Sequence, residues 1–213
     1  MKNDHSITTL FVDVGGVLLN DGWDHLARKR AAKHFEIKWT EMEMRHSLTF
    51  ELHEQGRLTF ENYLDLVVFY EKRTFSRTQF RNFMCDQSQP FPSMIGLVKE
   101  IKKNYGLKVV VVSNESRDLN AYRIKEFKLG NFVDFFVSSC FVGLRKPDSE
   151  FFRLALDLAQ ARPEQVIYLD NTPMFIGIAE ALGIRSILHV DYESTYTALA
   201  SLGLKDVKEG EGA

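Results

Sequence analysis

The sequence predicts an α/β fold, in which a doubly wound (Rossmann-like) parallel sheet forms the core and a small helical cap is inserted after its first strand. Short apolar runs without polar alternation recur between amphipathic segments, as expected of strands buried on both faces of a parallel sheet. The stretch 20–89, which follows the first of these runs, contains helix signals but no strand candidate of comparable strength.

The first predicted strand and the cap are recognisable from local patterns. Residues 8–13 form an apolar run rich in β-branched residues, which is typical of a buried strand. From residue 23 to about residue 83 the apolar residues recur at helical spacing. Thr59 can cap one helix of this stretch, and Ser76 with Gln79 forms the capping box of another.

The remainder of the chain alternates between helices and strands. The prolines of 87–92 mark a linker into this part. The predicted strands are 108–114, 134–138, 166–170 and 185–189, and the predicted helices are 93–104, 116–128, one beginning at Pro147 or Asp148, one ending near Gly183, and 193–202. We therefore assign 1–19 and 90–213 to the core and 20–89 to the cap. We expect the polar, Gly-rich tail 205–213 to fray.

Composition narrows the class of protein. Of 213 residues, 45% are hydrophobic and 26% are charged, which is ordinary for a soluble globular protein. The formal net charge of -2 indicates neither a nucleic-acid nor a membrane partner. No apolar run is long enough to span a bilayer, and residues 1–6 lack the apolar core of a signal peptide. Because Cys85 and Cys140 are far apart, we expect a reduced, cytoplasmic protein.

The first predicted strand ends at a carboxylate. Asp13 is followed by Gly15 and Gly16, so the backbone beside it can be approached closely by a ligand. The alternative is a strand followed by a tight turn, with Asp13 merely solvated.

Other polar residues follow the predicted strands at the same edge of the sheet. The carboxyl ends of parallel strands meet at one edge, which is where ligands bind. This edge receives Ser113 and Asn114, Lys146, and Asp170 with Asn171. Each has a structural alternative, since Ser113 and Asp170 can cap helices and Lys146 can be a solvated lysine. Together they favour phosphoryl or acyl transfer through an aspartyl intermediate, with Mg²⁺ at the carboxylates.

Four motifs in order resemble those of the haloacid dehalogenase superfamily. They are Asp13-Val14-Gly15-Gly16-Val17-Leu18, Val112-Ser113-Asn114, Arg145-Lys146-Pro147-Asp148 and Leu169-Asp170-Asn171. The likeness covers nearly the whole chain, and the helical stretch resembles the small helical cap of that superfamily. The branch that looks most similar contains the glucose-1-phosphatases and the N-terminal phosphatase domain of soluble epoxide hydrolase.

The resemblance implies a Mg²⁺-dependent phosphatase that acts on a small phosphorylated metabolite, with a sugar phosphate as one candidate. It implies the following roles: Asp13 as nucleophile, Ser113 and Lys146 as catalytic residues that hold the phosphoryl group, Asn114, Gly15 and Gly16 as substrate-binding residues, and Asp13, Gly15, Asp170 and Asn171 around the metal.

The chain departs from the superfamily pattern at three positions. Phosphatases of the superfamily usually carry a second aspartate two residues after the nucleophile as general acid, but this chain has Gly15. We expect Gly15→Asp to raise activity on substrates with poor leaving groups. Asn171 replaces an acid that ligates magnesium, and Phe175 stands where Asn or Asp is common, so metal affinity should fall.

These departures keep two alternatives open. One is a 2-haloacid dehalogenase, which uses the same nucleophile on carbon without a metal. The other is a catalytically degenerate binding protein that has kept the fold. In the cap, the candidates to face the substrate, each with a structural alternative, are Trp23, Arg45, His46, His53, Arg57 and Tyr63.

Overall fold

The structure is a computed structural model that describes residues 6–205. The signal-peptide interpretation of residues 1–6 and the expected fraying of the tail therefore fall almost wholly outside the described part of the chain. Between residues 6 and 205, none of the helices combines the length and the apolar character that crossing a bilayer requires.

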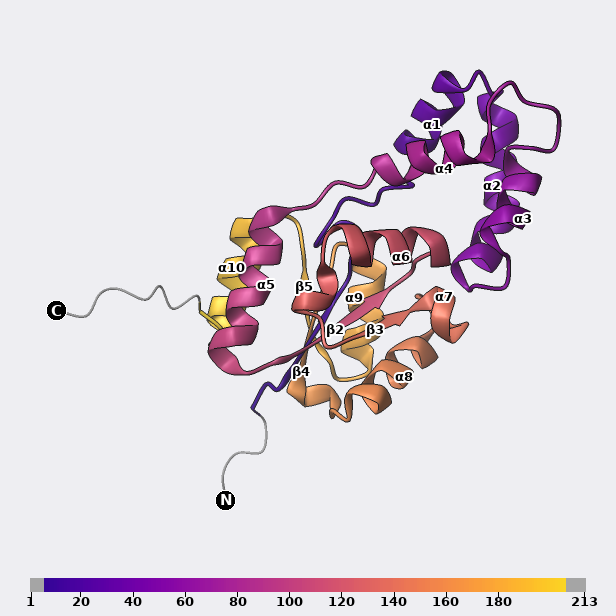
Figure 1. Ribbon diagram of the computed structural model, residues 1–213. Coiled ribbons are helices and arrows are strands. Elements are labelled where there is room, and N and C mark those ends of the chain that lie inside the picture. The colour runs from indigo at the N-terminus through magenta and orange to yellow at the C-terminus, as the bar shows by residue number, and fades with distance from the viewer. Residues whose placement is uncertain (1–5, 206–213) are drawn as a thin grey trace.

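A parallel sheet of five strands forms the centre of the described chain (Figure 1). Its strands are β1 (Thr9–Val12), β2 (Lys108–Ser113), β3 (Phe135–Ser138), β4 (Val166–Asp170) and β5 (Arg185–Leu188), in the spatial order β3-β2-β1-β4-β5. Val12 of β1 pairs with Val111 of β2 and with Leu169 of β4. This register brings the polar ends of the three central strands to the same level of the sheet.

Helices cover both faces of the sheet, which confirms the doubly wound fold. On one face, α5 (Pro92–Tyr105) and α10 (Tyr192–Ser201) pack on the strands, and on the other face α8 (Ser149–Ala159) and α9 (Pro173–Ala181) do so (Figure 1). Helix α6 (Arg117–Glu126) follows β2. Both ends of every predicted strand agree with the structure to within one residue.

A few boundaries and short elements differ from the sequence prediction. Helix α8 begins at Ser149 rather than at Pro147 or Asp148, because the Asp148 side chain caps the helix from outside by accepting the Glu150 N–H at 2.9 Å. Three short elements have no sequence signal, namely α7 (Ser139–Val142), η1 (Leu129–Asn131) and η2 (Pro163–Gln165). Each is only about one turn long, so it carries no amphipathic repeat.

Four helices between β1 and α5 form a separate unit beside the sheet (Figure 1). They are α1 (His25–His34), α2 (Trp39–Glu54), α3 (Phe60–Val67) and α4 (Arg77–Asp86). Their apolar faces share a hydrophobic cluster that also includes Leu119 of α6. Thr59 accepts the N–H of Asn62 as N-cap, and Ser76 forms its capping box with Gln79, both as the sequence predicts.

The two segments that join this unit to the sheet are tied together and to α6. Asn20 donates its side-chain amide to the carbonyl of Gln87 at 2.9 Å. The guanidinium of Arg123, which is buried and paired with Glu115, donates to Ser88 Oγ at 3.1 Å and to the Asn20 carbonyl at 3.3 Å. A buried cation therefore holds both connections against the core.

A polar network of two buried side chains and one half-buried side chain lies in the helical unit. Trp23 Nε1 donates to the Tyr63 hydroxyl at 2.9 Å, and this hydroxyl lies 2.9 Å from His46 Nδ1. Because Tyr63 Oη already accepts from Trp23, its own hydrogen is available to the imidazole, which then accepts as a neutral ring. Burial lowers the pKa of His46 from 6.5 to about 3.

This network predicts an acid-sensitive helical unit. Because the folded-state pKa of His46 lies below its ordinary value, the unfolded chain takes up a proton first, and stability is lost as the pH falls below about 6.5. Between pH 7 and pH 5 the loss from His46 amounts to roughly 2 kcal/mol. Urea unfolding followed by the fluorescence of Trp23 and Trp39 measures it.

The variant His46→Asn keeps an acceptor for Tyr63 but cannot take up a proton, so its stability should fall less between pH 7 and pH 5. His34→Asn, at an exposed position of α1, serves as the matched control and should behave as the wild type does. Equal losses in the wild type and in His46→Asn would contradict the assignment of this acid sensitivity to His46.

Candidate active site

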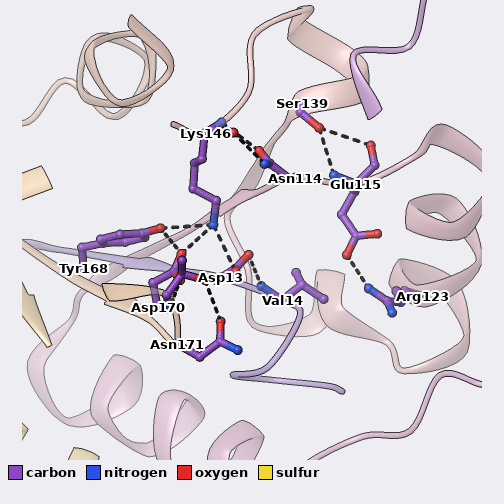
Figure 2. A network of polar contacts seen from close by, with 11 residues as sticks. Asp13, Val14, Asn114, Glu115, Arg123, Ser139, Lys146, Tyr168, Asp170 and Asn171 are labelled. Atoms are coloured by element: carbon purple, nitrogen blue, oxygen red, sulfur yellow. Dashed lines mark hydrogen bonds and ion pairs between the residues drawn. The ribbon is translucent and has the colours of Figure 1, made fainter. Parts of the chain in front are cut away.

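The ends of the three central strands and the residue before α8 place four polar side chains together. Asp13 follows β1, Ser113 ends β2 and Asp170 ends β4, while Lys146 enters from the segment between α7 and α8. Figure 2 shows Lys146 reaching across the ends of the strands toward both carboxylates. The convergence follows from the register of the sheet, because Val12, Val111 and Leu169 lie side by side.

Lys146 is the centre of this arrangement (Figure 2). Its side chain is 1% exposed, and its Nζ lies 3.0 Å from Asp13 Oδ2, 2.6 Å from Asp170 Oδ2 and 3.1 Å from the Tyr168 hydroxyl. Burial alone would lower the pKa of Lys146, but Asp13 and Asp170 outweigh this effect and raise it above its ordinary value. The site therefore contains a fixed positive charge.

Asp170 lies beneath the site rather than on its surface. Its side chain is fully buried, and its oxygens accept from Lys146 Nζ, from the Tyr168 hydroxyl and, at 2.7 Å, from the N–H of Thr172. Asp170 does not line the cavity, whereas the next residue, Asn171, does. The geometry thus gives Asp170 the role of holding Lys146 in place.

Asp13 is the carboxylate that meets the cavity. Its Oδ1 accepts the N–H of Val14 at 2.8 Å, and its Oδ2 faces Lys146. Burial raises the pKa of Asp13 to about 7, and the negative charge of Asp170 adds to this increase. Lys146 and the Ser113 hydroxyl act in the opposite direction, because they favour the ionised form. The result is a desolvated carboxylate whose charge depends on its neighbours, as expected of a nucleophile.

Asn114 positions the lysine through the main chain. Its amide donates to the Lys146 carbonyl at 2.9 Å and accepts the Lys146 N–H at 2.8 Å (Figure 2). This reciprocal pair fixes the backbone that carries Nζ. Asn114 also lines the cavity, so it can support Lys146 and contact a ligand from the same place.

The two glycines after Asp13 allow close approach of other side chains. At Gly16, which has φ +72°, a Cβ would lie 2.0 Å from Asn171 Nδ2. At Gly15 a Cβ would lie 3.0 Å from Asp21 Oδ1. Burial, followed by the neighbouring charge of Asp24, raises the pKa of Asp21. Gly15 and Gly16 therefore make room for specific polar neighbours rather than only for a ligand.

The cavity lies between the sheet edge and the helical unit, and its volume is about 580 Å³. From the core it is lined by Asp13, Ser113, Asn114, Lys146 and Asn171. Of the cap candidates, Trp23, His46 and His53 line it, whereas Arg45, Arg57 and Tyr63 do not. A cavity of this size fits a small metabolite.

The oxygen donors beside Asp13 limit what metal the site can hold. Among residues 6–205, no group of three or more His, Cys, Asp and Glu side chains could hold a metal ion. Magnesium needs only one or two carboxylates when substrate phosphate and water complete its coordination. The Asp13 carboxylate and the Asn171 amide oxygen have the right chemistry, and with a single charged ligand they fit a weak magnesium site.

Several residues of the site were not found by sequence reasoning. Tyr168 bonds to both Lys146 and Asp170. Phe175, by contrast, already stands out in the sequence as a departure from the superfamily pattern, and its ring centre lies 4.9 Å from Lys146 Nζ. Tyr168 could have been found from strand alternation, because it precedes Asp170 by two residues and so points to the same face of β4. Asp21 has no such signal, since it lies in an irregular segment.

The helical unit contacts the core beside the cavity. Arg145 pairs with Glu54 at 2.9 Å and with Glu51 at 3.1 Å, and Ser139 Oγ donates to the Glu54 carbonyl at 2.6 Å. A Cβ on Gly56 would lie 2.2 Å from the Cys140 carbonyl oxygen. The end of α2 is thereby fastened next to the segment that carries Lys146.

This combination of fold and strand-end residues defines a hydrolase of the haloacid dehalogenase type. The model of the haloacid dehalogenase-like hydrolase family matches residues 7–199, so the chain belongs to this family. Bifunctional epoxide hydrolase 2 of Sus scrofa is 33% identical over 104 residues, which are 47% of this chain and 18% of that protein. The chain thus matches a small part of this curated relative.

Solved structures share the fold at low sequence identity. A HAD family enzyme from Bacteroides thetaiotaomicron, in complex with magnesium and inorganic phosphate, superposes with a TM-score of 0.73 and 20% identity over 86% of this chain and 94% of that chain. The L-2-haloacid dehalogenase from Xanthobacter autotrophicus, with chloropropionic acid covalently bound, gives a TM-score of 0.60 and 14% identity over 93% and 84%.

The packing of Asn171 on Gly16 leads to a prediction. Gly16→Ala places a Cβ within 2.0 Å of Asn171 Nδ2 at a positive φ, so it should displace Asn171 and destabilise the fold by about 1–3 kcal/mol. Gly96→Ala, in the middle of α5 with nothing within 4 Å of the new Cβ, should instead stabilise by about 0.5–1 kcal/mol. Urea unfolding of both variants checks the contrast, which equal effects would contradict.

Proposed function

We propose that the chain is a Mg²⁺-dependent phosphatase that cleaves a small phosphorylated metabolite through an aspartyl-phosphate intermediate on Asp13. The observation that carries the proposal is Lys146, a buried ammonium held between the cavity-facing carboxylate of Asp13 and the enclosed carboxylate of Asp170. A fixed cation beside a carboxylate nucleophile matches the charge that a phosphoryl group carries during transfer.

Each side chain has a separate role in the proposed phosphoryl transfer. An Asp13 carboxylate oxygen attacks phosphorus while the bond between phosphorus and the leaving-group oxygen breaks. Lys146 Nζ and the Ser113 hydroxyl donate to the non-bridging oxygens, and Asp170 with Tyr168 keeps Lys146 in place. Water then attacks phosphorus, which releases inorganic phosphate and restores Asp13.

The metal belongs to the same proposal. Asp13 and Asn171 would hold Mg²⁺ together with water and substrate phosphate, and the ion when bound would supply positive charge at the phosphoryl oxygens. Because Asn171 adds no charge, we infer that the ion binds more weakly than at a site with two carboxylates. The neighbouring enzyme solved with magnesium and inorganic phosphate supports the pairing of this fold with these two ligands.

The cap side of the cavity favours a neutral, hydrogen-bonding leaving group. Burial lowers the pKa values of His46 and His53, so both imidazoles are uncharged near neutral pH. The guanidinium of Arg28 is paired with Glu43 at 2.8 Å. Since these groups offer hydrogen bonds without net charge, we propose a polyhydroxylated leaving group, as in a sugar phosphate, over one that bears a second charge.

A dehalogenase is the second candidate. Its specific support is the neutral Asn171 together with Gly15, because displacement at carbon needs neither a metal nor a proton donor at these positions. The fold shared with the L-2-haloacid dehalogenase is consistent with this reaction. The fully buried Asp170 argues against the dehalogenase. It fixes a positive charge at Lys146, which a phosphoryl dianion requires.

Release of inorganic phosphate tests the proposal. With sugar phosphates, acyl phosphates and p-nitrophenyl phosphate, the wild type should release phosphate when Mg²⁺ is added. Asp13→Asn, which removes the nucleophile in a nearly isosteric way, should lower the rate by about 10³-fold or more. Asp86→Asn, at an exposed position of α4, is the matched control and should retain the wild-type rate.

Two results would overturn the phosphatase. Phosphate release that survives in folded Asp13→Asn would remove Asp13 from the reaction. Chloride release from 2-chloropropionate, with no phosphate release from any ester, would establish the dehalogenase instead.

A further inference from the structure

We propose that Asp21 is the proton donor to the leaving group and takes the place of the acid that is absent at position 15. This inference rests on the proposed phosphatase reaction and adds a catalytic residue to it. Asp21 lies outside all four motifs, in the irregular segment between β1 and α1.

The geometry points to Asp21 through the space beside Gly15. A Cβ built on Gly15 would lie 3.0 Å from Asp21 Oδ1 and 4.0 Å from Asp21 Cγ. A carboxylate carried by residue 15 would have its oxygens about 2.4 Å beyond its own Cβ, from ordinary bond lengths. The Asp21 carboxylate therefore lies close to the region that an acid at position 15 could reach, and Asp21 lines the same cavity as Asp13.

The segment that carries Asp21 is held firmly. The Asp21 carbonyl accepts the N–H of Trp23 at 2.8 Å. Gly22 adopts φ +67°, and a Cβ there would lie 1.9 Å from Arg123 Nη2, so the turn packs directly against the buried guanidinium. A side chain on this turn keeps its place relative to the sheet, although the chain has already left the core.

Asp21 is the acid of the cavity that has no partner among the described residues. No hydrogen bond or ion pair is formed by its carboxylate within residues 6–205. The other acids that line the cavity outside the strand ends are all engaged: Asp24 with the N–H of Ala27, Glu43 with Arg28, Glu54 with Arg145, and Glu115 with Arg123. Among these acids of the described chain, Asp21 alone is free to meet a substrate oxygen.

The proton transfers balance over one turnover. As the bond from Asp13 to phosphorus forms and the bond from phosphorus to the leaving oxygen breaks, the proton of the Asp21 carboxyl moves to that oxygen and an alcohol departs. The Asp21 carboxylate then takes a proton from the water that attacks phosphorus. The bond from phosphorus to Asp13 breaks, and inorganic phosphate, free Asp13 and protonated Asp21 result.

Moving the carboxyl group between positions 21 and 15 tests this role. The measurement is single-turnover cleavage of two esters, the sugar phosphate that the wild type cleaves fastest and 2,4-dinitrophenyl phosphate, whose leaving group needs no proton. Asp21→Ala should slow cleavage of the sugar phosphate by about 10²–10⁴-fold but that of the dinitrophenyl ester by no more than about 3-fold.

The double variant Gly15→Asp with Asp21→Ala provides the rescue. It should cleave the sugar phosphate at least about tenfold faster than Asp21→Ala does, because a carboxyl group returns to the same region. Gly15→Asp alone should not raise the rate, since its Cβ meets the Asp21 carboxylate at 3.0 Å. This revises the gain that the sequence suggests for that variant. Asp86→Asn again serves as the control.

Each remaining outcome is decisive. Equal loss on both esters, or no loss on either, would overturn the role of Asp21. Failure of the double variant to recover, when it is folded by Trp23 and Trp39 fluorescence, would overturn it as well. A wild type that cleaves neither ester would overturn the phosphatase itself, and a wild type that cleaves only the dinitrophenyl ester would show that no proton donor operates.

Discussion

The site depends on one buried cation held between two carboxylates. Lys146 is desolvated, and taking a charge out of water is costly unless close partners compensate. Asp13, Asp170 and the Tyr168 hydroxyl provide those partners within 3.1 Å. The surrounding structure keeps these partners in position. The β1–β4 register sets the spacing of the two carboxylates, and the Asn114 amide fixes the backbone of Lys146. One carboxylate is left facing the cavity, and the other is committed to the lysine.

A second buried cation, Arg123, connects this site to the helical unit. Arg123 pairs with Glu115 just after β2 and also binds the two segments that join the helical unit to the sheet. Arg145, which precedes Lys146 in the chain, pairs with Glu54 and so fastens the end of α2 beside the site. The wall of the cavity that would meet a leaving group is thus held from two sides by charges that belong to the core.

Sequence patterns predict the features that regular structure produces. The strands, the caps at Thr59 and Ser76, and the convergence of Asp13, Ser113, Lys146 and Asp170 follow from apolar periodicity and from the geometry of a parallel sheet. What the sequence could not resolve is which of two adjacent residues faces the cavity. Asp170, the last residue of β4, turns inward to Lys146, whereas Asn171, the first residue after the strand, lines the cavity. Asp21 was missed for a related reason: its position depends on an irregular turn packed against Arg123, and no periodic pattern encodes such a contact.

The covalent state of Asp13 during turnover distinguishes an aspartyl-phosphate reaction from any other chemistry at this site. We would quench the wild type within the first turnover on its fastest phosphate ester and determine by peptide mass spectrometry which residue is modified. We predict a single phosphoryl group on the peptide that contains Asp13, at the carboxylate that faces Lys146. A phosphoryl group on another residue, or the organic part of the substrate attached to Asp13, would contradict it.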